Sequence, residues 1–198
     1  MAYRYCGALP GEEAAEDQAS PQPTEHLRSL QLGDRPLCLR ELRADDGARI
    51  ESLLTQVAAP DLQMRFFGAL RHVPPELLDY LMHSDPTHRV TVAAVLGGGP
   101  GETEGEIVGV ARAHRVTAHV AEAAMLVRSD LKRHGLGSLL LGSLIARCRQ
   151  RGISRLIAEV LHCNSGMLRL ARQYGFRCAS VEDQVCHLVL DLPAAAAG

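Results

Sequence analysis

The chain has 198 residues, a formal net charge of −2, 46% hydrophobic residues and 22% charged residues. This length is enough for one domain with a full core, and the near-neutral charge gives no strong attraction to nucleic acid or to an anionic membrane. No apolar run is long enough to span a bilayer, and the N-terminus lacks the apolar core of a secretory signal. The sequence therefore predicts a cytoplasmic protein without nucleic-acid or membrane partners.

The chain is predicted to divide into a leader and one folded domain. Residues 1–33 are rich in Glu, Ala, Pro, Ser and Gln, and such a segment cannot bury enough apolar surface to fold alone. We expect it to be flexible or to dock as an arm. Residues 34–198 are expected to form a single domain that ends in a frayed tail.

The six cysteines do not indicate a metal centre. None forms a CxxC or CxC pair, so a zinc site is not expected, and the intracellular setting argues against disulfides. Several lie in apolar strand or helix patterns, where a free cysteine behaves as a small hydrophobic residue.

In the first half of the domain, apolar residues follow the strand and helix periods in turn. Alternation over 35–43 predicts a half-buried strand, and 44–58 opens with acidic residues before a helical pattern. The buried face of this helix would carry Ile50, Leu53, Leu54 and Val57. A second helix is predicted over 73–84, and 88–116 is typical of two strands around a glycine-rich turn.

The second half continues the alternation. It predicts a strand that ends near Val127, a helix that begins near Ser138, and a strand over 154–161. A helix over 164–175 and a strand pair over 176–192 complete the domain. Helices lie between strands, so the domain belongs to the α/β class with a mixed sheet. The two strands that flank the helix from Ser138 are expected to be parallel neighbours.

The segment DLKRHGLG, residues 130–137, places a basic turn with two glycines directly before a buried helix. The first N–H groups of a helix have no partners within it, and with the helix dipole they form an anion site. Gly135 and Gly137 lack a Cβ, so a phosphate can approach the backbone closely. Lys132, Arg133 and His134 add positive charge. A glycine turn with solvated charges is the alternative, and the spacing matches neither a P-loop nor a Rossmann turn.

Two motifs at this separation resemble the GNAT N-acetyltransferase superfamily. KRHGLG is similar to its Q/R-x-x-G-x-G/A signature, with Lys132 at the Q/R position, and CNSGMLRLARQYGF (163–176) is similar to its later Asn-containing motif. A closer resemblance is to the catalytic domain of bacterial Pat-type protein lysine acetyltransferases. The resemblance implies a mostly antiparallel twisted sheet, with helices on both faces and a central parallel strand pair splayed around the cofactor.

The resemblance implies acetyl-CoA as co-substrate and no metal. Its pyrophosphate would lie on the backbone of residues 132–138, which adds Leu136 and Ser138 to the residues named above. Its pantetheine arm would pair along the end of the preceding strand. That strand end comprises Met125, Leu126 and Val127. Asn164 matches the motif Asn and would hydrogen-bond the arm, although Asn is also a favoured helix N-cap.

Glu122 is the candidate catalytic base. A lysine amine has a pKa of about 10.4 and is protonated at neutral pH, so a base must remove a proton before it can attack. Glu122 interrupts the otherwise apolar strand HVAEAAMLV and aligns with the acidic residue that resembles the general base of Pat-type enzymes. A glutamate at a solvent-facing strand edge is the alternative.

The proton donor for the leaving thiolate and the acceptor both stay open. Many superfamily members carry a Tyr seven residues after the motif Asn, where this chain has Ala171, and Tyr174 points elsewhere on the helix. The acceptor is expected to be a primary amine, with a protein lysine favoured over a small molecule. A non-catalytic acyl-CoA sensor is a further alternative, and the oligomeric state is left open.

Overall fold

The protein is described by a computed structural model that covers residues 30–68, 74, 78, 81, 82, 87–97 and 105–193. Its strands form one eight-stranded sheet in the order β1-β2-β3-β4-β5-β6-β8-β7. Neighbouring strands are antiparallel except for β5 and β6, which are parallel. The predicted mixed sheet and its parallel pair are therefore confirmed.

The eight strands agree with the predicted alternation, with one addition at the start. They are β1 (Leu30–Leu32), β2 (Arg35–Arg40), β3 (Arg89–Leu96), β4 (Glu106–Arg115), β5 (Val120–Val127), β6 (Arg155–Leu161), β7 (Arg177–Glu182) and β8 (Val185–Asp191). Strand β1 was not predicted, and it pairs antiparallel with β2. The sheet thus extends at least to residue 30, inside the segment assigned to the leader.

The helices differ from the prediction near the start of the domain. The predicted helix over 44–58 is divided into a 3₁₀ turn, Ala44–Asp46, and the helix α1, Gly47–Thr55. The turn arises because the Asp46 carboxylate points inward to Arg40, with Oδ2 2.6 Å from Nη1 and Oδ1 2.7 Å from Nη2. It also accepts the backbone N–H of Arg43 at 2.7 Å. These bonds hold the chain in a tight turn before α1 starts.

Helix α2, Ala59–Phe66, was not predicted. Pro60 lies in its first turn, where the missing N–H costs no hydrogen bond. The predicted helix over 73–84 lies mostly outside the described residues, and within them Leu78, Leu81 and Met82 are helical. The remaining long helices are α4, Leu136–Gln150, and α5, Ser165–Gln173, as expected.

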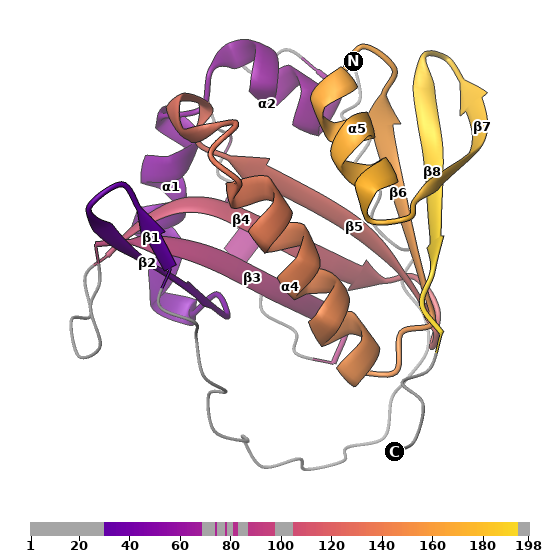
Figure 1. Ribbon diagram of the computed structural model, residues 1–198, viewed down its shortest axis with the longest axis horizontal. Helices are drawn as coiled ribbons and strands as arrows, with labels where there is room; N and C mark the ends of the chain where they lie inside the picture. Colours follow the sequence, from indigo (N-terminus) through magenta and orange to yellow (C-terminus); the bar gives the residue numbers. More distant parts are fainter. Residues whose placement is uncertain are drawn as a thin grey trace.

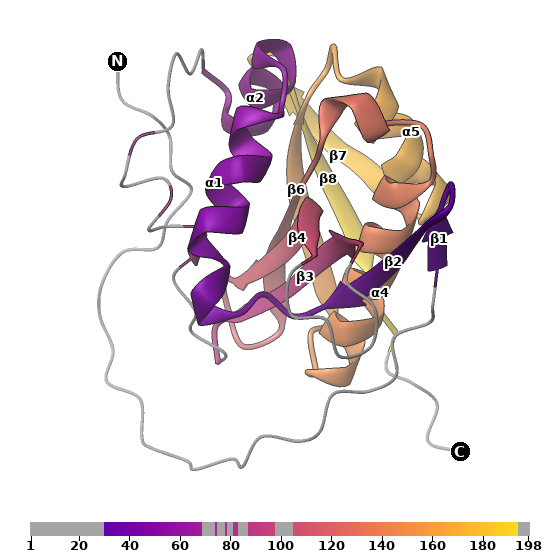
Figure 2. The same ribbon diagram turned by 90° about the vertical axis from the view of Figure 1, so that its left-hand side faces the viewer.

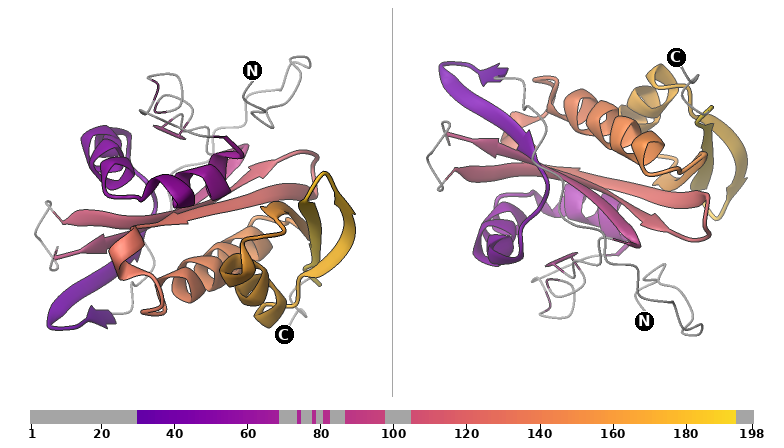
Figure 3. Two further views of the ribbon diagram at one scale, coloured as in Figure 1. Left: turned by 90° about the horizontal axis from the view of Figure 1, so that it is seen from above. Right: turned by 90° about the horizontal axis from the view of Figure 1, so that it is seen from below.

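The helices form a layer on each face of the sheet. Figure 1 shows α4 crossing the sheet in front, and Figure 2 shows α1 and α2 on the opposite side of the sheet from α4. The two views in Figure 3 look along the sheet edge and separate the α1/α2 face from the α4/α5 face. This arrangement is the two-sided α/β architecture that the sequence indicated.

Each layer packs on its own hydrophobic cluster. Helix α4 buries one apolar stripe, comprising Leu136, Leu140, Leu141, Leu144, Ile145 and Cys148, against β3, β4 and β5. Helix α1 buries Ile50, Leu53 and Leu54 against the opposite face. The sheet is therefore held rigidly between the two layers, and the strands that carry the candidate site residues are fixed in position.

Candidate active site

The turn before α4 has the geometry of an anion site. Arg133 and Gly135 are both left-handed, with φ angles of 67° and 84°, and Gly135 is the N-terminal cap of α4. The N–H of Leu139 donates to the Gly135 carbonyl at 3.0 Å. The backbone N–H groups before that of Leu139 in this first turn therefore have no acceptor within the helix. Together with the helix dipole, they favour the binding of a phosphate.

The only lysine of the chain, Lys132, is tied to helix α2. Its Nζ forms an ion pair with Oδ1 of Asp61, and the hydroxyl of Ser129 donates to Oδ2 at 2.5 Å. The N–H of Ala58 donates to Oγ of Ser129 at 2.8 Å. Burial raises the pKa of Asp61, but the hydrogen bonds from Lys132 and Ser129 outweigh it, so its pKa lies below the ordinary value. Asp61 thus stays ionised and holds Lys132 at the edge of the turn.

Strands β5 and β6 part in the middle of the sheet. Their parallel pairing runs from Val120 opposite Arg155 to Glu122 opposite Ile157 and goes no further. Strand β5 continues to Val127 and stays paired with β4 on its other side. The second half of β5 therefore presents one backbone edge without β6 beside it, which an extended ligand could pair with.

Glu122 lies where the two strands part. Its neighbours Ala121 and Ala123 are buried in the cluster under α4, so strand alternation directs Glu122 to the α1/α2 face. The side chain is half-buried, and its residue pairs directly with His114 of β4. The side chain thus lies on the α1/α2 face, at the point where β5 and β6 part.

A cleft of about 570 Å³ occupies the gap between the strands. This volume is within the range of small-molecule sites. Ten of the predicted site residues line it, and they come from β5, the turn, the start of α4 and the N-terminus of α5. They are Glu122, Met125, Leu126, Val127, Lys132, Arg133, Gly135, Gly137, Ser138 and Asn164.

Two predicted site residues do not line the cleft with their side chains. Nδ1 of the exposed His134 lies 2.9 Å from the carbonyl oxygen of Lys132, so the ring folds back on its own turn. Leu136 is 1% exposed and belongs to the core. The prediction for both residues concerned the backbone of the turn, and their backbone remains part of it.

Other predicted residues have a structural partner as well as a place in the cleft. Oδ1 of Asn164 accepts the N–H of Met167 at 3.1 Å as the cap of α5, which leaves the amide group for a ligand. The hydroxyl of Ser138 lies 2.8 Å from that of Tyr174. A Cβ on Gly137 would lie 3.2 Å from Cδ2 of Leu170, so this glycine allows close packing of α4 and α5.

Helix α2, which the sequence did not predict, ends beside the cleft. Asp61, Met64 and Arg65 of α2 and its C-cap Phe67 line the cleft on the α1/α2 face. Phe66 instead packs on the core, where the Arg65 guanidinium lies 4.8 Å from its ring centre. The adjacent residues Phe66 and Phe67 are therefore divided between the core and the cleft.

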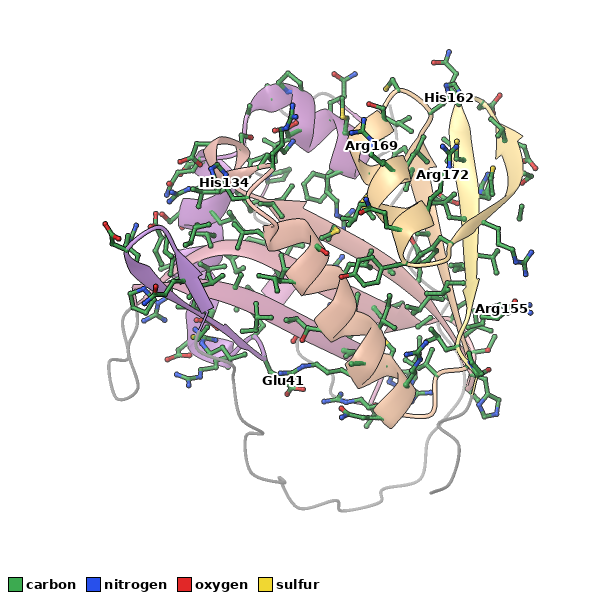
Figure 4. All side chains as sticks on the ribbon, in the orientation of Figure 1. Glu41, His134, Arg155, His162, Arg169 and Arg172 are labelled. Atoms are coloured by element: carbon green, nitrogen blue, oxygen red, sulfur yellow. The ribbon has the colours of Figure 1, made fainter. Side chains whose placement is uncertain are left out.

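Strand β6 and helix α5 supply further lining residues that were not predicted. Glu159 lines the cleft from β6, and α5 contributes Met167, Arg169, Leu170 and Gln173. Figure 4 shows Arg169 on α5 and His134 on the turn that precedes α4. Glu159 had the same sequence signal as Glu122, because it also interrupts an apolar strand, RLIAEVL.

Within the described part of the chain, no group of three or more His, Cys, Asp or Glu side chains could hold a metal. The cysteines that the structure describes are free. Burial raises the pKa of the Cys148 thiol to about 12, so it is inert. Cys163 is exposed beside Asn164. None of the described helices is long and apolar enough to cross a membrane.

The sheet, the parted strands and the turn before α4 define an acetyltransferase fold. The Acetyltransferase (GNAT) family profile matches residues 58–176, which is more than half of the chain, and the protein belongs to this family. The matched region includes α2, the parted strands, the turn and α5.

Individual relatives agree with this family assignment. The chain is similar to the GNAT domain of Streptomyces lividans PAT, with 30% identity and a TM-score of 0.71 over 79% of this chain and 91% of that one. It is 27% identical to an acetyltransferase of Pseudomonas aeruginosa over 76% of this chain and 79% of the relative. A Salmonella typhimurium structure, described as a putative acetyltransferase with its cofactor acetyl-CoA, shares the fold at 18% identity and a TM-score of 0.60, over 81% of this chain and 96% of that one.

Proposed function

We propose that the protein transfers an acetyl group from acetyl-CoA to a primary amine, with a protein lysine as the favoured acceptor. The observation that carries this proposal is the position of Glu122. Its carboxylate lines the same cleft as the N-terminal turn of α4, at the point where β5 and β6 part. One cleft would thus combine a phosphate cradle, an open strand edge and a base.

The residues of the cleft fit acetyl-CoA, which would supply the activated acetyl thioester. The amides around Gly135 and Gly137, with Lys132 and Arg133, would hold the pyrophosphate. The backbone edge of Met125, Leu126 and Val127 would pair with the pantetheine arm, and the free amide of Asn164 would hydrogen-bond it. A main-chain N–H of the same edge would stabilise the oxyanion that develops on the carbonyl.

Glu122 would act as the general base. The acceptor amine arrives protonated, and the proton must leave before the nitrogen can attack the carbonyl carbon. Glu122 would take that proton, directly or through one water. Its side chain faces the α1/α2 side, whereas the turn opens on the α4 side. Donor and acceptor would therefore enter from opposite faces and meet between the strands.

The favoured acceptor class rests on the likeness to the S. lividans PAT domain and on the Pat-type motifs in the sequence. A small amine is the alternative, because the loops that would contact the acceptor decide between the two. Incubation of the protein with labelled acetyl-CoA and either a cell lysate or an amine library tests this. Label in protein lysines supports the favoured class, and label only in small amines supports the alternative.

Substitution of Glu122 tests the catalytic assignment. Glu122→Gln keeps the size and polarity of the side chain, so it should still bind acetyl-CoA while kcat falls by about 10²–10⁴-fold. Glu51→Gln on the exposed face of α1 is the matched control. An unchanged rate across pH in the Glu122 variant would refute the base. Binding of acetyl-CoA without transfer to any amine would favour a sensor.

A further inference from the structure

We infer that Glu159 is an acceptor-binding residue that selects amines with a second positive charge near the reacting one. This inference rests on the proposed function and deepens it. Glu159 lines the cleft together with Glu122, and its side chain is 38% exposed, so a ligand can reach it. No step of the transfer reaction needs this second carboxylate.

The sheet places Glu159 and Glu122 on the same face. Leu156, Ala158 and Val160 of β6 belong to the cluster under α4. Strand alternation therefore directs Ile157 and Glu159 to the α1/α2 face, where Glu122 also points. Both carboxylates thus face the side from which the acceptor would enter, under helix α2, which contacts both strands.

The spacing of the two carboxylates sets the chemistry of the acceptor. Ile157 is the partner of Glu122 across the strands, and Glu159 lies two residues further along β6. A strand rises by about 3.3 Å per residue and neighbours lie about 4.8 Å apart, so the two backbones are separated by roughly 8 Å or more. An acceptor with two cationic groups can therefore place one group beside each carboxylate.

Charge is sorted between the two halves of the cleft. The cofactor half has Lys132, Arg133 and Arg169, from the turn and from α5, and the carboxylate of Asp61 is paired with Lys132 there. The acceptor half has Glu122 and Glu159, with Met64 of α2 and the C-cap Phe67 as an apolar wall. An anionic nucleotide and a cationic acceptor would each meet the complementary side. Arg65 also lines the acceptor half, with its guanidinium stacked on Phe66, and it keeps its positive charge there, so the two carboxylates exceed it by one charge.

The carboxylate of Glu159 lies near a neighbour on β8. Glu159 is directly opposite His187 in the antiparallel ladder, and Oε1 lies 3.5 Å from Nδ1 of the imidazole. This contact leaves the other oxygen, Oε2, for a ligand.

The acceptor chemistry is an amine with a second cation at a spacing near that of the two carboxylates. A peptide lysine with an arginine neighbour carries two such charges, and so does a long-chain diamine. The contacts described above fit either kind of acceptor. Matched pairs of acceptors separate them: a lysine peptide with or without the arginine, and a diamine or the monoamine of equal length.

The test compares kcat and KM of the wild type, Glu159→Gln and the control Glu51→Gln. The Gln variant should raise KM for the dicationic member of a pair by about three- to five-fold, the size of a partly exposed ion pair, with kcat unchanged. KM for the monocationic member should not change, and Glu159→Asp should restore part of the loss. Equal effects on both members, or no effect on either, would overturn the inference.

These outcomes are distinct from failure of the proposed function. If the wild type acetylates no amine, the transferase assignment fails before Glu159 is tested. If Glu122→Gln slows the reaction while Glu159→Gln leaves every KM unchanged, the transferase assignment stands and only the inference about Glu159 fails. Circular dichroism of each variant checks that its fold is intact.

Discussion

Asp61 and Lys132 connect the helix on one face of the sheet to the phosphate turn on the other. Asp61 lies in the first turn of α2, and its two oxygens are held by Lys132 and Ser129. Because α2 also lines the acceptor half of the cleft, this pair fixes the relative position of the two halves. The pair also anchors the only lysine of the chain beside the site proposed for the pyrophosphate.

The Asp61 pair should make stability depend on acid pH. The pKa of Asp61 is lowered from its ordinary 3.8 in the folded protein. At a pH between the lowered pKa and the ordinary one, the unfolded chain therefore binds more protons than the folded protein. The stabilisation is complete above the ordinary value and is lost as pH falls through the folded one. Asp61→Asn should cost about 1 kcal/mol at neutral pH and less in acid.

Urea unfolding of the wild type and Asp61→Asn over a series of pH values measures this difference. The exposed Asp34→Asn is the control, and it should change stability little at any pH. A cost for Asp61→Asn that stays constant down to strongly acidic pH would show that the carboxylate charge contributes nothing.

Gly135 and Gly152 offer a matched pair for the phosphate turn. They lie at opposite ends of α4 with φ angles of 84° and 72°, and a Cβ on either would meet no atom within 4 Å. Aspartate at either position therefore costs a similar backbone strain. Only Gly135→Asp places a negative charge beside the proposed pyrophosphate site.

Calorimetric titration with coenzyme A should separate the two variants. Gly135→Asp should weaken binding by about ten- to a thousand-fold, the range of one repulsive charge at close distance in a partly screened site. Gly152→Asp should bind as the wild type does. If both variants bind equally well, the phosphate is not held at the start of α4.

The sequence analysis was most successful where periodicity and motif coincide. The turn before α4 and the parallel strands around it were predicted because the helix carries a long apolar stripe and a glycine directly precedes it. Helix α2 was missed because it is short and amphipathic only in part, with core contacts through Leu62 and Phe66. Its position over the cleft depends on the Asp61–Lys132 pair, which joins residues far apart in the sequence.

The charged residues show a second limit of prediction from the sequence alone. Asp46 was assigned to a helix start, where acidic residues are common, but tertiary contact with Arg40 turns it into the core. Glu159 was not singled out, although it interrupts an apolar strand as Glu122 does. The two glutamates differ from ordinary surface residues only once the strand register places both on one face, and register between distant strands is not visible in one sequence.

The Arg40–Asp46 pair should be a main determinant of stability. Asp46 is fully buried and Arg40 is 8% exposed. Burial raises the pKa of Asp46, but the bonds from Arg40 and the Arg43 backbone outweigh it, and its pKa lies below the ordinary value. Asp46→Asn would leave Arg40 buried without its counter-charge, which costs about 3–5 kcal/mol.

Guanidinium unfolding at neutral pH measures this cost. The neighbouring Asp45→Asn is the control, because Asp45 is exposed and its substitution should change the free energy of unfolding by no more than about 0.5 kcal/mol. Equal effects of the two substitutions would mean that the buried pair gives no net stabilisation over neutral partners.

Tyr174 should contribute to stability and not to catalysis. Its hydroxyl donates to the carbonyl oxygen of Ser138 at 2.6 Å and lies 2.8 Å from the Ser138 hydroxyl. It also lies against Gly142, where a Cβ would come within 2.9 Å of it. These contacts join α5 to α4 and engage the proton that a general acid would have to give to the thiolate.

Tyr174→Phe should therefore lower the free energy of unfolding by about 1–2 kcal/mol through lost hydrogen bonds, while kcat and its alkaline pH profile stay the same. Chemical unfolding and a pH series of acetyl transfer measure the two effects separately. A fall in kcat of tenfold or more, together with loss of an alkaline limb, would make Tyr174 the proton donor. Ala171, at the superfamily's Tyr position, has no group that can donate a proton. For Tyr174 to take that role, its hydroxyl would have to break its hydrogen bond to Ser138 during the reaction.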